Sequence, residues 1–230
     1  MATKRPQLVK GISPKGTFRY PHLVTPDNGT EEYPKKNPEY NVQLIMSEEE
    51  GAAFREKLQD SIDAAEELAH EKDAKRKPAS RKKNPMEFND PMQPEYDDET
   101  EEETGNVIFR FKTQASGKTK AGKKWSKQIA FRDAKTKKFS PDAVWGGTVG
   151  RIAYSINPYF VEGNGMWGIT LFIDAVQIID LVANSGDSGD CGFEEEEGFE
   201  SSSEEQFEEE DESYDDDDDD DDNEDEDGDF

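Results

Sequence analysis

The last part of the chain cannot form a hydrophobic core. From Asn184 to Phe230 it carries 27 acidic residues and no Lys or Arg, and it finishes on an apolar ring. Such a segment buries too little apolar surface to offset the entropy of ordering, which predicts a disordered tail. The fold must therefore be specified by residues 1–183, which form one domain by the usual relation of length to domain number, with residues 184–230 as its tail.

The predicted tail holds all of the net charge. The chain has 55 acidic and 28 basic residues, a formal charge of −27, so the acids and bases of residues 1–183 are equal in number. These charges are nevertheless segregated. Residues 107–140 contain eleven Lys or Arg and one acid, Asp133, whereas residues 87–103 contain nine acids and no base. This pattern predicts a basic surface that binds a polyanion, with acidic segments that compete for it.

Several classes of protein lack support in the sequence. No apolar run approaches the ~20 residues that span a bilayer, and the N-terminal residues lack the apolar core of a signal peptide. The single cysteine, Cys191, excludes an internal disulfide and fits a reducing compartment. With only two histidines, a Cys/His zinc site or a Cys–His nucleophile is not expected. Since phosphate-loop and nucleophile-elbow motifs are also missing, we expect no enzymatic activity, no metal and no cofactor.

The hydrophobic pattern predicts strands with one change of period. After a loose basic arm over residues 1–16, alternating apolar residues predict strands over 16–24, 39–46, 106–115, 148–159 and 166–182, with a lysine-rich hairpin after residue 115. Ser47 and Glu50 have the spacing of a capping box, which starts a predicted amphipathic helix over 48–75. Residues 78–105 are expected to form a long, mobile, charged loop.

Together these elements predict a mainly β fold. Five or more strands with glycine-rich turns and one helix indicate a small antiparallel barrel with the helix packed against it. The leading candidate is the oligonucleotide-binding fold, which is a five-stranded Greek-key barrel. A β-sandwich is the alternative, and the strand pattern does not separate the two.

Basic residues are interleaved with aromatic residues in the later strands. This mixture suits single-stranded nucleic acid, because cations follow the phosphates and exposed rings stack on bases. Duplex recognition would favour a helix shaped for the major groove, whereas the predicted helix is acidic on its polar face. The candidate contacts are Arg110, Phe111, Lys112, Lys120, Lys123, Lys124, Trp125, Arg151 and Tyr159. At least one of Phe109 and Phe111 is expected in the core with Tyr154, while Trp125 is expected to be exposed.

The sequence also resembles a known family. The stretches "GTFRYPHLVTPDNG", "GNVIFRFKTQASGKTKAGKKW", "GGTVGRIAYSINPYFVEGNGMWGITLFIDAVQIIDL" and the final "EDGDF" occur in an order that is similar to the replication single-stranded-DNA-binding protein of T-seven-like bacteriophages. The resemblance covers nearly the whole chain. It implies an oligonucleotide-binding barrel with the helix inserted between the second and third strands, and DNA contacts by Tyr159 and by Arg81, with Lys82 and Lys83 beside it. Gln114 stands where relatives can place a ring, so Trp125 is expected to replace that contact.

The resemblance further implies partners and a place of action. We expect a role in phage DNA replication, recombination and repair in the cytoplasm of a bacterial host, possible homodimers, and a tail that recruits phage DNA polymerase and helicase–primase. The tail is expected to compete with DNA for the basic groove, and partners to recognise Asp225, Glu226, Asp227, Asp229 and Phe230. An acidic chaperone for basic proteins is the alternative, although it would not need the basic segment. A metal-dependent nuclease is a third reading.

Overall fold

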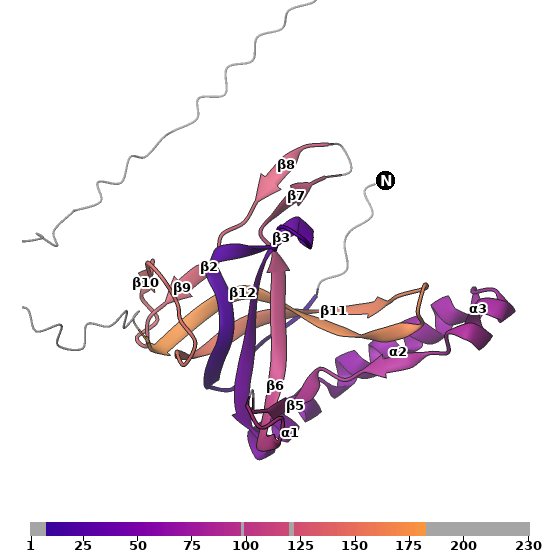
Figure 1. The fold of residues 1–230 in the computed structure, drawn as a ribbon, viewed down its shortest axis with the longest axis horizontal. Coiled ribbons are helices and arrows are strands. Elements are labelled where there is room, and N and C mark those ends of the chain that lie inside the picture. The colour runs from indigo at the N-terminus through magenta and orange to yellow at the C-terminus, as the bar shows by residue number, and fades with distance from the viewer. Residues whose placement is uncertain (1–7, 98, 120–121, 183–230) are drawn as a thin grey trace, which may run out of the picture. The chain divides into compact units, whose positions relative to one another are not determined.

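The fold is known from a computed structural model that describes residues 8–97, 99–119 and 122–182 (Figure 1). All of these residues lie in the first of two units into which the chain divides, Met1–Gly189. Lys120, Cys191 and the residues expected to recruit partners, Asp225 to Phe230, lie outside the described part. The boundary after residue 183 and the disorder of the tail therefore stay predictions.

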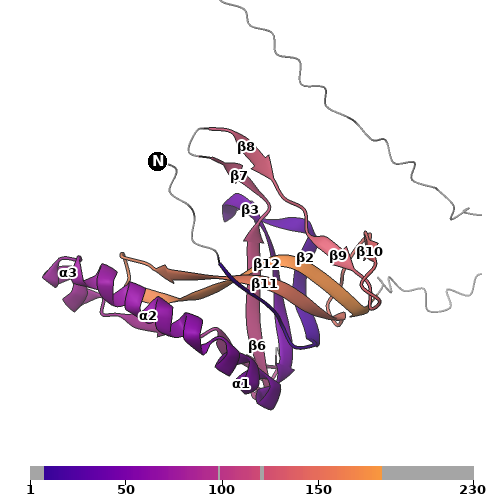
Figure 2. The same ribbon diagram turned by 180° about the vertical axis from the view of Figure 1, so that it is seen from behind.

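Five long strands close into a barrel (Figures 1 and 2). They are β2 (Gly16–Gly29), β3 (Pro34–Ser47), β6 (Glu103–Gln114), β11 (Val149–Phe160) and β12 (Met166–Asp180). β11, β2, β3 and β6 pair antiparallel in that order, β6 pairs parallel with β12, and β12 returns to β11. The predicted oligonucleotide-binding barrel is confirmed, and the sandwich alternative is wrong because one sheet closes on itself.

Alternation along the strands fills the barrel with apolar side chains. On β3 the residues Tyr40, Val42, Leu44 and Met46 point inward, as the period of two requires. Phe109, Phe111 and Tyr154 come from β6 and β11 and are also buried. The expectation that at least one of Phe109 and Phe111 joins Tyr154 in the core is confirmed, since both do. Phe111 as a DNA contact is wrong, because its side chain is fully buried.

The helical segment lies between the second and third barrel strands, as predicted, but it is not one helix. α1 (Glu48–Lys57) begins at Ser47, whose hydroxyl accepts a hydrogen bond from the Glu50 N–H at 3.3 Å. The helix breaks at the buried Leu58, and α2 (Gln59–Ala74) continues along β11 and β12. Phe54 packs edge-on against Phe109 and Tyr154, with ring centroids 4.8 and 5.7 Å apart, which anchors α1 to the barrel interior.

Residues 78–105 are not the structureless loop that their charge predicts. They form α3 (Pro78–Lys83), β4 (Glu87–Asn89), which is parallel to β12, and β5 (Met92–Tyr96), which is antiparallel to β6, before β6 begins at Glu103. The scattered apolar residues of this segment explain the order. Met86, Phe88 and Met92 pack against the core, and the Phe88 ring lies 4.6 Å from that of the buried Trp167.

Short strands complete the sheets. β1 (Val9–Ile12) pairs with β11, so the residues expected to form a loose arm are ordered from Val9. β9 (Ala130–Arg132) and β10 (Lys138–Phe139) extend the sheet beyond β12. β7 (Ser116–Lys118) and β8 (Lys124–Ser126) form the predicted lysine-rich hairpin, which projects from the barrel in both views (Figures 1 and 2). None of the described helices is long and apolar enough to cross a membrane.

Candidate nucleic-acid interface

The cations of β6 lie on the outside of the barrel. Since Phe109 and Phe111 point into the core, Arg110 and Lys112 between and after them must point outward, and both are exposed. Arg110 is the cross-strand partner of Gln43, and Lys112 that of Asn41 on β3. We call the outward side of β3, β6 and β12 around these two cations the cationic face.

The β7–β8 hairpin adds an aromatic ring among lysines. Trp125 is 37% exposed, as predicted, and it stands directly across from Gly117. Its indole covers that glycine so closely that an added Cβ would lie 3.0 Å from the ring. A groove of about 460 Å³ beside it is lined by Lys36, Asn37, Pro38, Ser116, Gly117, Lys118, Lys124, Trp125 and Ser126. No acid lines this groove among the described residues, and Lys123 is exposed at the hairpin end.

Tyr159 on β11 also lies across from a glycine of the neighbouring strand, as Trp125 does. It is half-buried and faces Gly168 of β12, where an added Cβ would lie 3.2 Å from the tyrosine oxygen and 3.5 Å from a ring carbon. The Asn89 amide donates a 2.7 Å hydrogen bond to its hydroxyl. Both candidate stacking rings, Trp125 and Tyr159, are thus seated on a cross-strand glycine, which leaves less freedom to be lost on binding a base.

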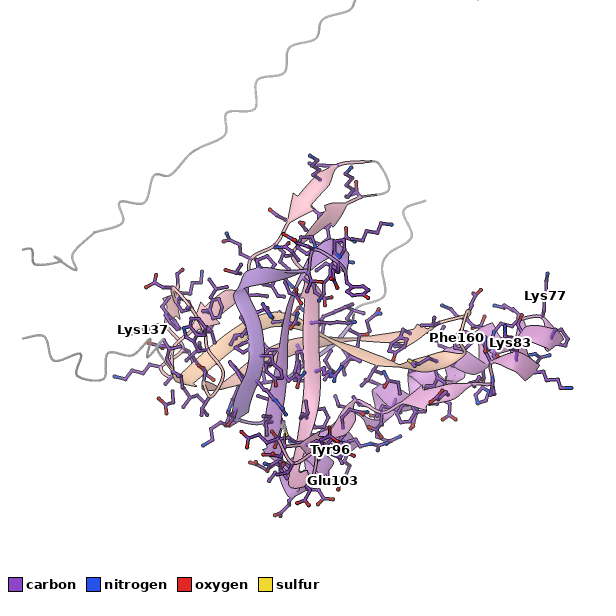
Figure 3. All side chains as sticks on the ribbon, in the orientation of Figure 1. Lys77, Lys83, Tyr96, Glu103, Lys137 and Phe160 are labelled. Atoms are coloured by element: carbon purple, nitrogen blue, oxygen red, sulfur yellow. The ribbon has the colours of Figure 1, made fainter. Side chains whose placement is uncertain are left out.

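Arg81, Lys82 and Lys83 are exposed on α3, at the far end of an arm made of α2, α3 and residues 157–170 (Figure 3). The buried Arg76 holds this end together. Its guanidinium pairs with Asp73 at 2.7 Å, donates to the Asn84 carbonyl at 3.1 Å and lies 5.6 Å from the Phe160 ring centroid. The Asn84 amide in turn donates to the Gly163 carbonyl at 2.7 Å, which ties α3 to the turn between β11 and β12.

Arg151 does not join these residues. It is exposed near the start of β11, at the opposite end of that strand from Tyr159. Its cross-strand partner is Gln177, which is paired in turn with Arg132 of β9. Arg151 therefore belongs with the cations of β9 and β10, and the labelled Lys137 shows how far that region lies from Lys83 (Figure 3).

Phe172 is an outward ring that the sequence reasoning did not single out. It is half-buried and is paired with Lys112 of β6 and Ser155 of β11. Its neighbours Leu171 and Ile173 are in the core, so Phe172 shares the cationic face with Lys112. The signal was present in the alternation of the last strand, in which Phe172 is out of phase with the other large apolar residues.

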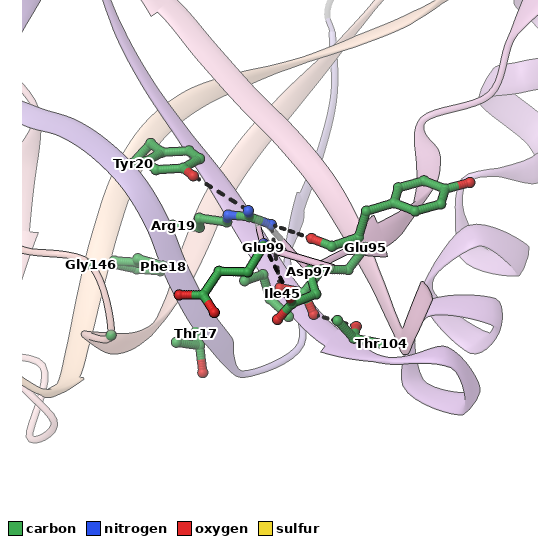
Figure 4. Close-up of a pocket in the computed structure, with 12 residues that line it drawn as sticks. Thr17, Phe18, Arg19, Tyr20, Ile45, Glu95, Asp97, Glu99, Thr104 and Gly146 are labelled. Atoms are coloured by element: carbon green, nitrogen blue, oxygen red, sulfur yellow. Dashed lines mark hydrogen bonds and ion pairs between the residues drawn. The ribbon is translucent and has the colours of Figure 1, made fainter. Parts of the chain in front are cut away.

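An acidic pocket lies between β2, β3 and the segment that follows β5 (Figure 4). A cavity of about 450 Å³ there is lined by Arg19, Tyr20, Ile45, Glu95, Asp97 and Glu99 among others. Arg19 pairs with Glu95 at 3.5 Å, and its guanidinium lies 5.0 Å from the Tyr20 ring centroid. Backbone hydrogen bonds from Thr100 and Glu99 lower the pKa of Asp97, and Arg19 lowers it further. The three acids place negative charge here, and like charge disfavours a polyanion.

No described cluster of His, Cys, Asp or Glu could hold a metal ion. Within residues 8–182, apart from positions 98, 120 and 121, several acidic side chains instead pair with cations or cap turns, as Asp73 and Asp90 pair with arginines and Asp97 caps a turn. The nuclease reading gains no support from this part of the chain.

The chain is similar to known proteins in its fold and in its match to a family. No curated protein matches the sequence. The structure is similar to the crystal structure of gp2.5, a single-stranded-DNA-binding protein encoded by bacteriophage T7, with a TM-score of 0.56 and 20% identity over 85% of this chain and all of that one. The single-stranded-DNA-binding protein of bacteriophage Enc34, solved with single-stranded DNA, has a TM-score of 0.49 and 15% identity over 77% of this chain and 89% of that one. Residues 16–181 match the family described as "Single-stranded DNA-binding protein, Bacteriophage T7", and the chain belongs to this family.

Proposed function

We propose that this protein binds single-stranded DNA without requiring a sequence motif and without enzymatic activity. One observation carries the proposal: half-buried rings and exposed cations lie on the same side of neighbouring strands. Lys112, Phe172 and Ser155 form one cross-strand row, and Tyr159 lies four residues after Ser155 on the same side of β11. Phosphates would follow the cations while bases stack on the rings.

The β7–β8 hairpin lies at one end of the proposed DNA path, and the arm that carries α3 lies at the other. The lysines beside Trp125 supply charge at one end, and Arg81, Lys82 and Lys83 supply it at the other. Membership of the family and the lack of acids in the hairpin groove support this path. An acidic chaperone would have no use for exposed rings set among cations.

The finer roles of the protein belong to the same proposal. The tail, with its 27 acids, competes with DNA for the cationic face and frees itself when a strand binds. Phage DNA polymerase and helicase–primase then recognise the acidic run with Phe230, which places the protein in DNA replication, recombination and repair in the host cytoplasm. Sedimentation of the intact and tail-deleted proteins tests the expected homodimer.

Substitution of the hairpin tests the binding mode. We expect Trp125→Ala to weaken oligo-dT binding by about 1–3 kcal/mol with little change in salt dependence. Lys123→Ala with Lys124→Ala should instead flatten the slope of log affinity against log salt by about one unit. Fluorescence-anisotropy titrations over a series of salt concentrations measure both effects.

A matched control is available in Trp145, which is 44% exposed in the segment before β11. Trp145→Ala should leave both affinity and slope unchanged. Equal affinity of the wild-type protein for single strands and for duplex of the same length would overturn the stacking mode, since rings need unstacked bases.

A further inference from the structure

An acidic side chain of β12, Asp174, lies on the cationic face, and its place in a DNA path needs an explanation. Ser155 donates a 2.6 Å hydrogen bond from its hydroxyl to Oδ2 of Asp174. Ser155 is the cross-strand partner of Phe172, so its side chain is on the outward side of the sheet, where it is only 5% exposed, whereas Phe172 and Asp174 are half-buried. The carboxylate of Asp174 therefore lies on the same face as the Phe172 ring.

A β-bulge produces this placement. The register of β11 and β12 shifts between Ala153 and Tyr154, which pair with Ala175 and Ile173. Asp174 is thus the extra residue of β12, without a partner across the strand. A bulge changes the direction of a side chain. Here the Asp174 carboxylate points toward Ser155 and lies on the same face as the Phe172 ring.

Asp174 forms no direct ion pair within the described residues, although the Lys127 ammonium donates a 2.7 Å hydrogen bond to the carbonyl of the adjoining Ile173. None of the ion pairs found there includes it, and Ser155 provides the one hydrogen bond found to its carboxylate. An ionised carboxylate accepts more than one hydrogen bond, so acceptor positions remain. It repels a phosphate, whereas Lys112 on the other side of Phe172 attracts one. A bound strand is therefore expected to place its phosphate on the Lys112 side of Phe172 and its base edge on the Asp174 side.

We propose that Phe172 and Asp174 form a base-binding subsite that favours bases carrying an exocyclic amino group. The base stacks on Phe172, its amino group donates to Asp174, and Lys112 holds the adjoining phosphate. Cytosine presents such a donor at N4, and carboxylates accept from it. Thymine and uracil present a carbonyl oxygen at the same position, which a carboxylate disfavours. The inference rests on the proposed single-stranded-DNA binding and adds a modest base preference to it.

Oligo-dC and oligo-dU of equal length are the decisive probes, because cytosine and uracil differ only at position 4 and the adjoining ring nitrogen. Binding to the full chain is measured at mildly alkaline pH, where cytosine is unprotonated. We expect oligo-dC to bind about fivefold more tightly, the low end of discrimination by one base contact. Asp174→Asn should bring the ratio close to one.

Two further variants separate the roles. Phe172→Leu should weaken both oligonucleotides by about the same factor, because stacking is tolerant of base identity. Asp180→Asn removes an identical charge from the exposed end of the same strand and should preserve the preference. Circular dichroism of each variant verifies the fold.

The outcomes are distinguishable. Equal wild-type affinity for the two oligonucleotides overturns the subsite while single-stranded-DNA binding stands. Failure to bind either one overturns the proposed function itself. If Asp174→Asn strengthens both oligonucleotides equally, the carboxylate only repels phosphate and the base contact is wrong. Unchanged affinities in Phe172→Leu would remove the ring from the site.

Discussion

Two aromatic side chains pack over glycines of the neighbouring strand, which leave room for the rings. Gly117 lies under Trp125 and Gly168 under Tyr159, and an added methyl group would press against the ring at 3.0 Å in the first case. At Gly168 it would also meet the backbone oxygen of Asn89 at 2.8 Å. If the two rings stack on bases as proposed, the absence of a side chain at these glycines serves DNA binding as well as packing.

Gly168→Ala should therefore weaken DNA binding without removing any contacting atom. The new methyl group must displace Tyr159 or β4, and we expect a loss of stability of about 1–3 kcal/mol, as for other overpacked sites. Affinity for oligo-dT should fall by a similar factor to that caused by Tyr159→Ala. Gly163→Ala is the control, because nothing lies within 4 Å of its added Cβ. Normal DNA affinity in a folded Gly168→Ala protein would contradict this account of the tyrosine.

Among the elements, the far end of the β2–β3 hairpin is held by an ionic cluster. Lys35 contacts both Asp27, at 2.7 Å, and Glu39. The hydrogen bond from Lys35, with one from the Gly29 N–H, lowers the pKa of Asp27 from 3.8 to about 2. Because the folded-state pKa is the lower one, the charged carboxylate stabilises the hairpin above its unfolded pKa, and this contribution is lost as the pH falls through the folded value.

The wild-type melting temperature should accordingly contain a component that disappears between about pH 4 and pH 2. Asp27→Asn should lower the melting temperature at neutral pH by about 2–4 °C, since an exposed pair contributes at most about 1 kcal/mol. The variant should also lack that part of the acid transition. Thermal melts at a series of pH values measure it, with exposed Asp142→Asn as the comparison. Parallel pH profiles for wild type and Asp27→Asn would show that the cluster contributes nothing.

Element prediction succeeded where long periodic patterns exist and failed where order depends on distant contacts. The barrel strands and the helix start at Ser47 follow from local sequence, whereas the break at Leu58 does not. β4 has three residues, too few for a period to be visible, and its order comes from Phe88 stacking on Trp167, far along the chain. The charged composition of residues 78–105 therefore concealed a folded segment.

The same distinction applies to the site. Alternation alone places Arg110 and Lys112 outside, and it should have excluded Phe111 and drawn attention to Phe172. That Arg151 lies apart from Tyr159, although both are on β11, depends on strand length and sheet closure. Two residues of the same long strand, such as Arg151 and Tyr159, can therefore belong to different surfaces of the molecule.

At the scale of the whole molecule, a neutral body is joined to a strongly anionic tail. Deleting residues 187–230 removes all 27 tail acids, and oligo-dT binding should tighten by about tenfold or more at low salt, where electrostatic competition is strongest.

Phe230→Ala leaves the charge unchanged and should not alter DNA affinity, but it should weaken capture of a phage polymerase by removing an apolar anchor. Anisotropy and pull-down assays on the same three proteins measure both properties. Unchanged affinity after deletion would end the competition hypothesis.

The closure of the barrel also has a consequence for synthesis of the protein. β2 completes the ring by pairing Gly16 and Thr17 with Gly150 and Val149, and β6 pairs with β12 only at Leu171 and Phe172. We therefore expect β2, β3 and β6 of a nascent chain to remain an open sheet until the last strand has left the ribosome. During that interval the inner faces of Phe109 and Phe111 lack their covering strands. Exposed strand edges and long-range pairing slow folding and favour aggregation, so the interval between translation of β6 and that of β12 is when this protein is most vulnerable.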